Sequence, residues 1–92
     1  MAARLFDRQL GARFLETVPA CPGVYRMHAA DGTVVYVGKA KSLRRRLAQY
    51  RNAKRVKKHA KMRAIVKSAA SATFTTCASE LEAELLEERL IR

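Results

Sequence analysis

The chain has 92 residues, and its 19 Lys and Arg outnumber 8 Asp and Glu, for a formal net charge of +11. This length predicts one small domain, 1–92, that buries about 60–65% of the surface of its unfolded chain. The sequence lacks the run of roughly eighteen apolar residues that a membrane-spanning helix needs, and it lacks a signal-peptide pattern. These features exclude an integral membrane protein, and we expect a cytoplasmic domain.

The segment 5–18 predicts a helix, because apolar residues recur at every fourth position from Phe6 to Phe14. Gly11 weakens the pattern, and Pro19 ends it, since proline cannot continue a helix.

Two β-rich segments, 23–27 and 33–37, flank an Asp-Gly pair at 31–32, which is the strongest short-range signal of a β-hairpin. The second segment is apolar on both faces, as is typical of a central strand covered on both sides by helices. Gly38 follows it, and we expect the backbone to leave the sheet there.

A basic helix is predicted after Ser42, a suitable N-cap residue. Its buried stripe has the spacing i, i+4, i+7 and consists of Leu43, Leu47 and Tyr50. At 100° per residue, Arg45 points away from this stripe and Arg46 lies at its edge. Arg46 is therefore the arginine expected to be held against the sheet.

The remainder of the chain predicts a break near 52–53, a second basic helix over 57–70 and a short strand over 72–77. Ser79 and Glu82 have the spacing of a capping box, so the last helix is expected to begin there.

The charges are unevenly distributed. No acidic residue occurs from Gly32 to Ser79, and the segment from Lys39 to Lys67 contains thirteen of the nineteen basic residues. A concentrated basic face is typical of a protein that binds a polyanion, most often nucleic acid. An anionic membrane or an acidic protein is an alternative partner, but no large apolar face opposes the basic one, as an interfacial helix would require.

Residues that could bind zinc are sparse. Cys21 and Cys77 are far apart and outside any metal-binding motif, so two free thiols are expected. His28 and His59 are too separated to indicate a metal cluster or a catalytic triad.

Five glutamates occupy the last helix, and Glu87 is singled out because Leu90 and Ile91 bracket it on the helical wheel. We expect Glu80, Glu84 and Glu88 on the opposite, exposed arc. An embedded carboxylate costs several kcal/mol unless it is paired or binds a metal. Both an ion pair with an arginine and a metal ligand therefore remain open for Glu87.

An ordered set of motifs resembles the GIY-YIG nuclease superfamily: Gly23-Val24-Tyr25, then Tyr36-Val37-Gly38, then Arg46 and finally Glu87. The segments 14–18, 22–27, 36–43 and 82–87 resemble, more narrowly, the N-terminal endonuclease domain of the bacterial UvrC excinuclease family or its shorter homologue Cho. The resemblance covers about 14–92.

This resemblance implies an α/β (α+β) fold, with a small three-stranded antiparallel sheet flanked by helices. It also implies metal-dependent hydrolysis of DNA, the 3′ incision of nucleotide excision repair. By position, Glu87 is the ligand of one Mg²⁺ or Mn²⁺ ion and Arg46 contacts the scissile phosphate. The resemblance places four further residues around the reacting water and phosphate: Tyr25, Tyr36, Lys39 and Tyr50.

Further residues are assigned on the same basis. Gly23 and Gly38 are expected to be structural glycines. The expected DNA-binding residues are Lys39, Lys41, Arg44, Arg45, Arg46 and Arg51.

No histidine is placed to serve as the general base. A tyrosine has an ordinary pKa of about 10, but we expect the pKa of Tyr36 to fall among Lys39, Arg46 and the metal. Tyr36 is therefore the predicted base or proton relay.

The chain ends soon after Glu87, where the family continues with a basic segment and further domains, so we expect a fragment of a longer protein or a minimal relative. The expected partners are damaged duplex DNA and, through absent parts of the parent protein, the helicase component of the excinuclease, UvrB. The alternatives are a non-catalytic nucleic-acid-binding module of the same fold and a ribosome-associated basic protein. The ordered Tyr, Arg and Glu residues favour the nuclease over the last alternative, which needs only positive charge.

Overall fold

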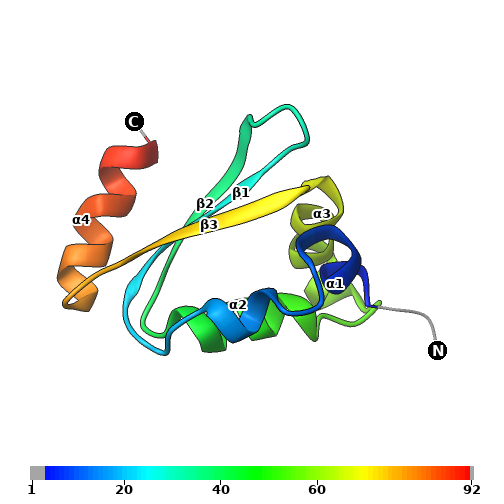
Figure 1. Cartoon of the computed structure of the whole chain (residues 1–92), viewed down its shortest axis with the longest axis horizontal. Helices are drawn as coiled ribbons and strands as arrows, with labels where there is room; N and C mark the ends of the chain where they lie inside the picture. The colour runs from blue at the N-terminus through cyan, green and yellow to red at the C-terminus, as the bar shows by residue number, and fades with distance from the viewer. Residues whose placement is uncertain (1–3, 92) are drawn as a thin grey trace.

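A computed structural model describes residues 4–91 as a three-stranded antiparallel sheet with helices around it, which confirms the expected α+β fold. The elements, with two short 3-10 helices labelled η, are α1 (Leu5–Leu10), η1 (Phe14–Thr17), β1 (Gly23–His28), β2 (Val34–Ala40), α2 (Leu43–Arg51), η2 (Lys57–His59), α3 (Ala60–Ser68), β3 (Ser71–Thr76) and α4 (Glu80–Ile91). In Figure 1, α2 runs beneath the strands, α1 and α3 gather at one end, and α4 stands at the other.

The strand order is β2-β1-β3, so β1 is the central strand. The prediction that 33–37 forms a central strand is wrong, because this segment lies in the edge strand β2. Val34 and Val35 are 46% and 40% exposed. The register shifts between Met27 and His28, a bulge that leaves Val35 without a partner on β1. The predicted hairpin is confirmed: Gly32 has φ 88°, and the Asp31 carboxylate accepts a hydrogen bond from the Thr33 amide.

The prediction that the backbone leaves the sheet at Gly38 is wrong, because β2 continues to Ala40. Gly38 pairs directly with Tyr25 on β1. A Cβ atom at Gly38 would overlap the Tyr25 hydroxyl and lie 2.5 Å from its Cζ. The glycine therefore makes room for a side chain rather than for a change of backbone direction.

The predicted helix over 5–18 is interrupted. α1 ends at Leu10 because Gly11 has φ 98°, a conformation that a helix cannot contain, and η1 follows after a turn. The helix predicted over 57–70 begins as η2 and becomes the α-helix α3 only from Ala60.

The main core lies between α2 and one face of the sheet. Leu43, Leu47 and Tyr50 are buried on α2, as predicted, and they belong to the same buried cluster as Tyr25 and Met27. The Ser42 hydroxyl accepts a hydrogen bond from the Arg45 amide, which confirms the predicted N-cap. α2 is thereby fixed beneath the sheet, with its arginines outside the core.

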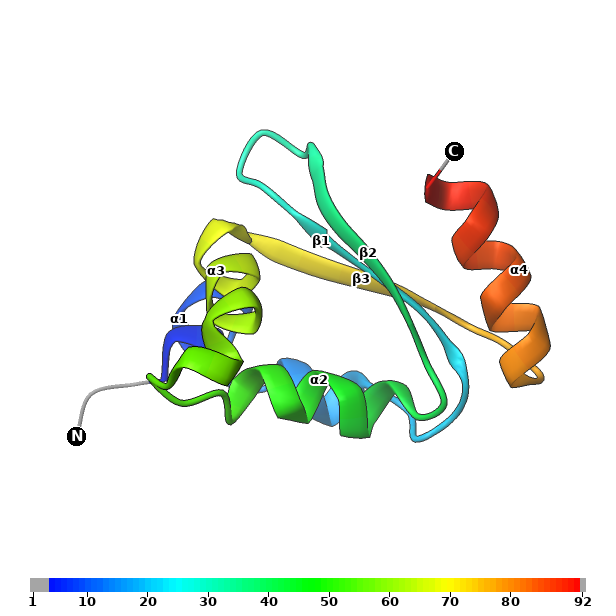
Figure 2. The same ribbon diagram turned by 180° about the vertical axis from the view of Figure 1, so that it is seen from behind.

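A smaller core lies on the other face of the sheet, where Val24, Cys77 and Ala83 are buried together. Both cysteines are free thiols, as expected. α4, seen from behind in Figure 2, contacts β1 and β2 and is far from α1 and α3. Its capping box is present: the Ser79 hydroxyl accepts from the Glu82 amide, while the Glu82 carboxylate accepts from the Ala78 amide.

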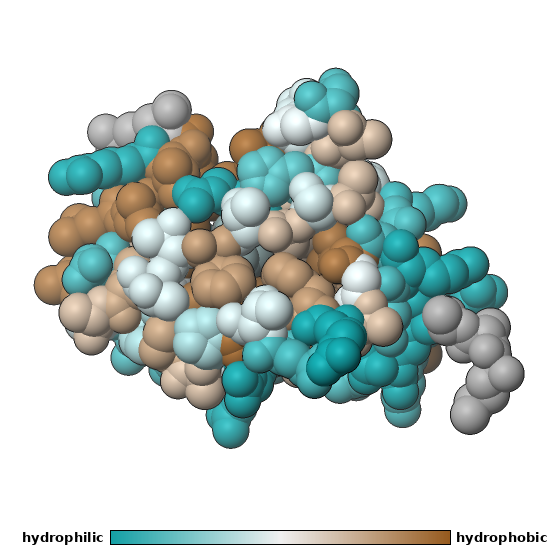
Figure 3. Space-filling model, in the orientation of Figure 1, coloured by the Kyte–Doolittle hydropathy of each residue, from teal (hydrophilic) through white to brown (hydrophobic). Residues whose placement is uncertain are grey.

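The outer side of α4 is apolar. Leu81 and Leu85 are 65% and 54% exposed, and hydrophobic side chains gather over this helix at the left of Figure 3. Between residues 4 and 91, the longest helices fall short of the length and apolar character needed to cross a membrane.

Candidate active site

Two buried tyrosines form the inner part of the candidate site. The hydroxyls of Tyr25 on β1 and Tyr50 on α2 are 2.8 Å apart and share a hydrogen bond. Their rings pack edge to face with centroids 5.7 Å apart. Burial raises the pKa of both phenols, and the hydrogen bond between them raises the pKa of Tyr50 further. Both side chains are therefore neutral hydrogen-bonding groups, not bases.

Arg46 lies beside this pair, half-buried at the edge of the α2 stripe, where its helical angle had placed it. Its guanidinium carbon is 5.8 Å from the centre of the Tyr50 ring, and its Nη1 donates to Gln49 Oε1 at 2.9 Å. Interaction with the Tyr25 hydroxyl is the main cause of a raised pKa for Arg46. The side chain is thus oriented by two aromatic residues and one amide.

Tyr36 on β2 completes the aromatic group, since its ring centroid is 6.1 Å from that of Tyr25. Unlike the hydroxyls of Tyr25 and Tyr50, its hydroxyl makes no hydrogen bond to another described residue. The Lys61 ammonium lies 5.7 Å from the centre of the Tyr36 ring. The role of Tyr36 as base or proton relay stays a prediction.

Lys39 and Lys41 lie at the end of β2 and just beyond it, between two neighbouring cavities. One cavity, of about 290 Å³, is shared with Arg45 and Arg46 of α2. The other, of about 240 Å³, is lined by α4 residues. The two lysine ammonium groups reach toward α4, Lys39 to Glu84 at 3.6 Å and Lys41 to Glu80 at 3.7 Å.

These ion pairs correct the predicted arrangement of the glutamates. Glu80 and Glu84 are not on the arc opposite Glu87: residues at i, i+4 and i+7 share one helix face, and this face meets the lysines of β2. Leu90 and Ile91 do not enclose Glu87 either, because they are 38% and 64% exposed.

Glu87 is nevertheless the one half-buried glutamate of α4, while the other four are exposed. It lies one turn after Ala83, which is 1% exposed and packs against Val24. No ion pair in the part of the chain that the structure describes includes Glu87. The alternative of a pair with an arginine is therefore not found, and the carboxylate is open for another cation.

A single carboxylate fits a Mg²⁺ or Mn²⁺ ion, because a hard cation of this kind keeps several waters and often uses one or two protein ligands. Within residues 4–91, no group of three His, Cys, Asp or Glu residues is arranged to hold a metal. The residues present thus suit a hydrated ion on one carboxylate and do not suit a fully enclosed site.

The structure brings together Tyr25, Tyr36, Tyr50 and Arg46, and it places Lys39 in a cavity shared with Arg46. Glu87 stands apart on α4, on the other side of the edge strand, and makes no hydrogen bond or ion pair with these described residues. Lys39 and Lys41 therefore line both the cavity that contains Arg46 and the cavity that contains the α4 carboxylates.

Besides Arg46, two of the predicted DNA-binding arginines make hydrogen bonds to distant parts of the chain. Arg44 Nε donates to the Val18 carbonyl at 2.7 Å. Arg51 makes two hydrogen bonds to the Asp7 carboxylate, at 2.9 and 3.0 Å, which raise the pKa of the guanidinium. DNA contact by these two side chains stays a prediction.

Sequence reasoning missed three residues at this site: Gln49, Lys61 and Glu84. The contact of Gln49 with Arg46 could have been found, because the two are three residues apart on a helix. The contacts of Lys61 and Glu84 join distant segments and had no local signal.

Comparison with known proteins identifies similar sequences. A model of the UvrC-like GIY-YIG domain matches residues 21–92. UvrABC system protein C of Serratia proteamaculans is 45% identical over 86 residues, and that of Stenotrophomonas maltophilia is 40% identical over 92 residues. The chain spans 14% of the length of each of these two relatives.

Solved structures are similar as well. The magnesium-bound GIY-YIG N-terminal endonuclease domain of UvrC from Thermotoga maritima superposes with a TM-score of 0.74 at 30% identity, covering 99% of this chain and 90% of that one. Point mutants of the same domain, bound to the catalytic divalent cation, superpose with TM-scores of 0.73 and 0.74.

Proposed function

The chain belongs to the UvrC-like GIY-YIG domain family, and from this premise we propose that it is a metal-dependent endonuclease domain that hydrolyses one phosphodiester bond of DNA. The observation that carries the proposal is the placement of Arg46 against the hydrogen-bonded pair of Tyr25 and Tyr50. We propose the 3′ incision of nucleotide excision repair as its reaction, since the relatives are named UvrABC system protein C.

Arg46 is proposed to hold the scissile phosphate. Its planar guanidinium can donate two parallel hydrogen bonds to the non-bridging oxygens, where negative charge increases in the transition state. Tyr25 and the aromatic ring of Tyr50 orient the Arg46 guanidinium before the substrate binds. Lys39, which lines the same cavity, adds a second positive charge.

Glu87 is proposed as the protein ligand of the cation. When bound, a divalent ion supplies positive charge that stabilises the leaving oxygen. Its half-buried position on α4 limits the number of orientations that the carboxylate can adopt, and the nearby Glu84 is paired with Lys39. Substrate phosphate would compete for Lys39, and the metal would compete for Glu84. The ion pair between these two residues is therefore expected to break when DNA binds.

Tyr36 is proposed to accept the proton of the attacking water. Tyr25 and Tyr50 are poor candidates, because burial raises the pKa of both. The tyrosines replaced by phenylalanine in the Thermotoga maritima mutants are ten and fourteen residues apart. Tyr25, Tyr36 and Tyr50 have the similar spacing of eleven and fourteen.

The proposed partners are those that the name of the relatives, UvrABC system protein C, implies. We propose that the basic face of this chain binds the damaged duplex, and that other parts of a parent protein contact the excinuclease helicase UvrB. Work on chromosomal DNA would place the domain in the bacterial cytoplasm.

A nicking assay on labelled duplex DNA, with and without Mn²⁺, tests the proposal. Glu87→Gln keeps the size of the side chain but removes its charge, and we expect it to lower the rate about 100-fold, as the loss of one electrostatic catalytic group commonly does. Glu88→Gln is the matched control, because Glu88 is the exposed neighbour of Glu87 on the same helix. It should cut at the rate of the unmodified chain.

Equal cutting by Glu87→Gln and the unmodified chain would show that the catalytic assignment is wrong. Metal-independent binding without any cutting would favour the alternative of a non-catalytic nucleic-acid-binding module.

A further inference from the structure

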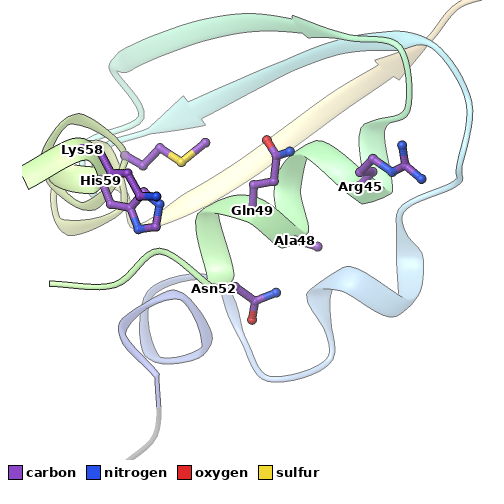
Figure 4. A pocket seen from close by; sticks show the side chains of 7 residues that line it. Arg45, Ala48, Gln49, Asn52, Lys58 and His59 are labelled. Atoms are coloured by element: carbon purple, nitrogen blue, oxygen red, sulfur yellow. The ribbon is translucent and has the colours of Figure 1, made fainter. Parts of the chain in front are cut away.

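A cavity of about 620 Å³ lies between α2 and the start of α3, outside the residues assigned to the reaction. It is open to solvent, and Figure 4 shows side chains of α2 and η2 around it. Its lining residues are Arg45, Ala48, Gln49, Asn52, Lys58, His59 and Met62. None of these described lining residues is acidic, so the cavity combines positive charge with apolar surface.

The oxygens of the two amides that line the cavity each accept a hydrogen bond from an arginine. Gln49 Oε1 accepts a hydrogen bond from Arg46, and Asn52 Oδ1 accepts one from Arg4 at 3.2 Å. Arginine can only donate, so these contacts fix which end of each amide is the oxygen. The NH₂ groups of Gln49 and Asn52 are left as the groups that can bind a ligand.

His59 is held in one tautomer by a backbone contact. Its Nδ1 accepts a hydrogen bond from the Lys54 amide at 2.8 Å. A neutral imidazole that accepts at Nδ1 carries its proton on Nε2, so the ring too offers a donor. With Arg45 and Lys58, the polar groups of the cavity wall then include several donors and two cations, which suit an anion.

This cavity adjoins the candidate active site. Arg45 and Gln49 also line the smaller cavity that contains Lys39 and Arg46. From Arg46 to Asn52 the helix rises about 9 Å at about 1.5 Å per residue. Successive phosphates of one DNA strand advance about 3.4 Å along the helix axis, so this distance corresponds to two or three nucleotides.

We propose that this cavity binds a backbone phosphate of the DNA strand being cut, two or three nucleotides from the scissile phosphate. Lys58, His59 and the NH₂ groups of Gln49 and Asn52 donate to that phosphate, and Met62 and Ala48 contact the adjoining sugar or base. The inference rests on the proposed function, because it takes the phosphate at Arg46 as the scissile one. It adds a second contact that fixes the direction of the strand along α2.

Fluorescence anisotropy with a labelled DNA duplex in EDTA tests this subsite without any need for cutting. Lys58→Glu replaces a donor with a carboxylate in the cavity, and we expect Kd to rise about tenfold. The slope of log Kd against log salt should fall by about 0.9, the value for one phosphate contact. Asn52→Asp keeps an oxygen that can accept from Arg4 but replaces the NH₂ donor with a negatively charged oxygen that repels a phosphate, so it should raise Kd about fivefold.

Lys67→Glu is the matched control, because it makes the same charge change at an exposed position outside the cavity. Its Kd should stay within about twofold, since exposed charges are screened over about 10 Å at 0.1 M salt. An equal loss of affinity in Lys67→Glu and Lys58→Glu, or no loss in Lys58→Glu, would overturn the subsite. A loss confined to the cavity variants in a chain that never cuts DNA would support the subsite and refute the nuclease function.

Discussion

The contact between Gly38 and Tyr25 makes the account testable through stability as well as activity. Gly38→Ala adds a Cβ on the edge strand where the Tyr25 ring lies, 2.5 Å from its Cζ and overlapping its hydroxyl. Tyr25 is 1% exposed and packed in the core, so the ring cannot turn into solvent without cost. Either the ring or the β2 backbone must move.

The size of the effect follows from two contributions. Overpacking of a well-filled core costs about 1–3 kcal/mol. Displacing Tyr25 also weakens its buried hydrogen bond to Tyr50, which contributes about 1 kcal/mol. We therefore expect Gly38→Ala to lower the free energy of unfolding by about 2–3 kcal/mol, and Tm by roughly 10–20 °C for a domain of this size.

Urea denaturation followed by circular dichroism measures this change. Gly32→Ala is the control: an added Cβ meets nothing within 4 Å there, so only the positive φ of 88° costs stability, about 1 kcal/mol. In a Tyr25→Phe background, Gly38→Ala has no hydroxyl to displace and should cost about 1 kcal/mol less. Equal stability of Gly38→Ala and the unmodified chain, or no effect of the Tyr25→Phe background, would refute the close contact.

Three further outcomes are expected. Burial raises the pKa of Tyr25 and Tyr50 in the folded state, so their contribution to stability is complete below the unfolded pKa of about 10 and is lost as pH rises further. Urea denaturation at pH values from 8 to 11 should therefore show a falling free energy of unfolding. Replacing both tyrosines by Phe should make the free energy of unfolding less dependent on pH. Asp7→Asn leaves the half-buried Arg51 without its carboxylate, so the free energy of unfolding, measured by urea denaturation, should fall by about 1–2 kcal/mol. Unchanged stability would contradict a stabilising ion pair between α1 and α2. Arg46→Lys keeps the charge but loses the planar fork, so single-turnover cutting should slow about 100-fold while the Kd for DNA changes little, and full activity would exclude bidentate phosphate contact.

The family and the fold were accessible from the sequence because their signals are local. The Asp31-Gly32 turn, the Ser42 cap and the stripe on α2 each depend on residues a few positions apart, and all three are confirmed. The order of the strands depends on contacts between distant segments. The β-branched run of β2 therefore predicted a central strand, although a bulge and an edge position leave two of its valines exposed.

The candidate site shows the same division. The angle of Arg46 to the buried stripe could be calculated from helix geometry, and the structure places the side chain accordingly. The hydroxyl contact between Tyr25 and Tyr50 joins a strand to a helix 25 residues away, and no local pattern announces it. The half-burial of Glu87 was predicted for the wrong reason, because Leu90 and Ile91 are themselves exposed.

The central claim is that Glu87 binds the catalytic cation, and a crystal of this chain soaked in Mn²⁺ tests it most directly. We predict an anomalous density peak about 2.0–2.3 Å from a Glu87 carboxylate oxygen, with the remaining ligands being water. The peak should disappear in Glu87→Gln and persist in Glu88→Gln. A peak on Glu80 or Glu84 instead, or no difference between the two variants, would contradict the account.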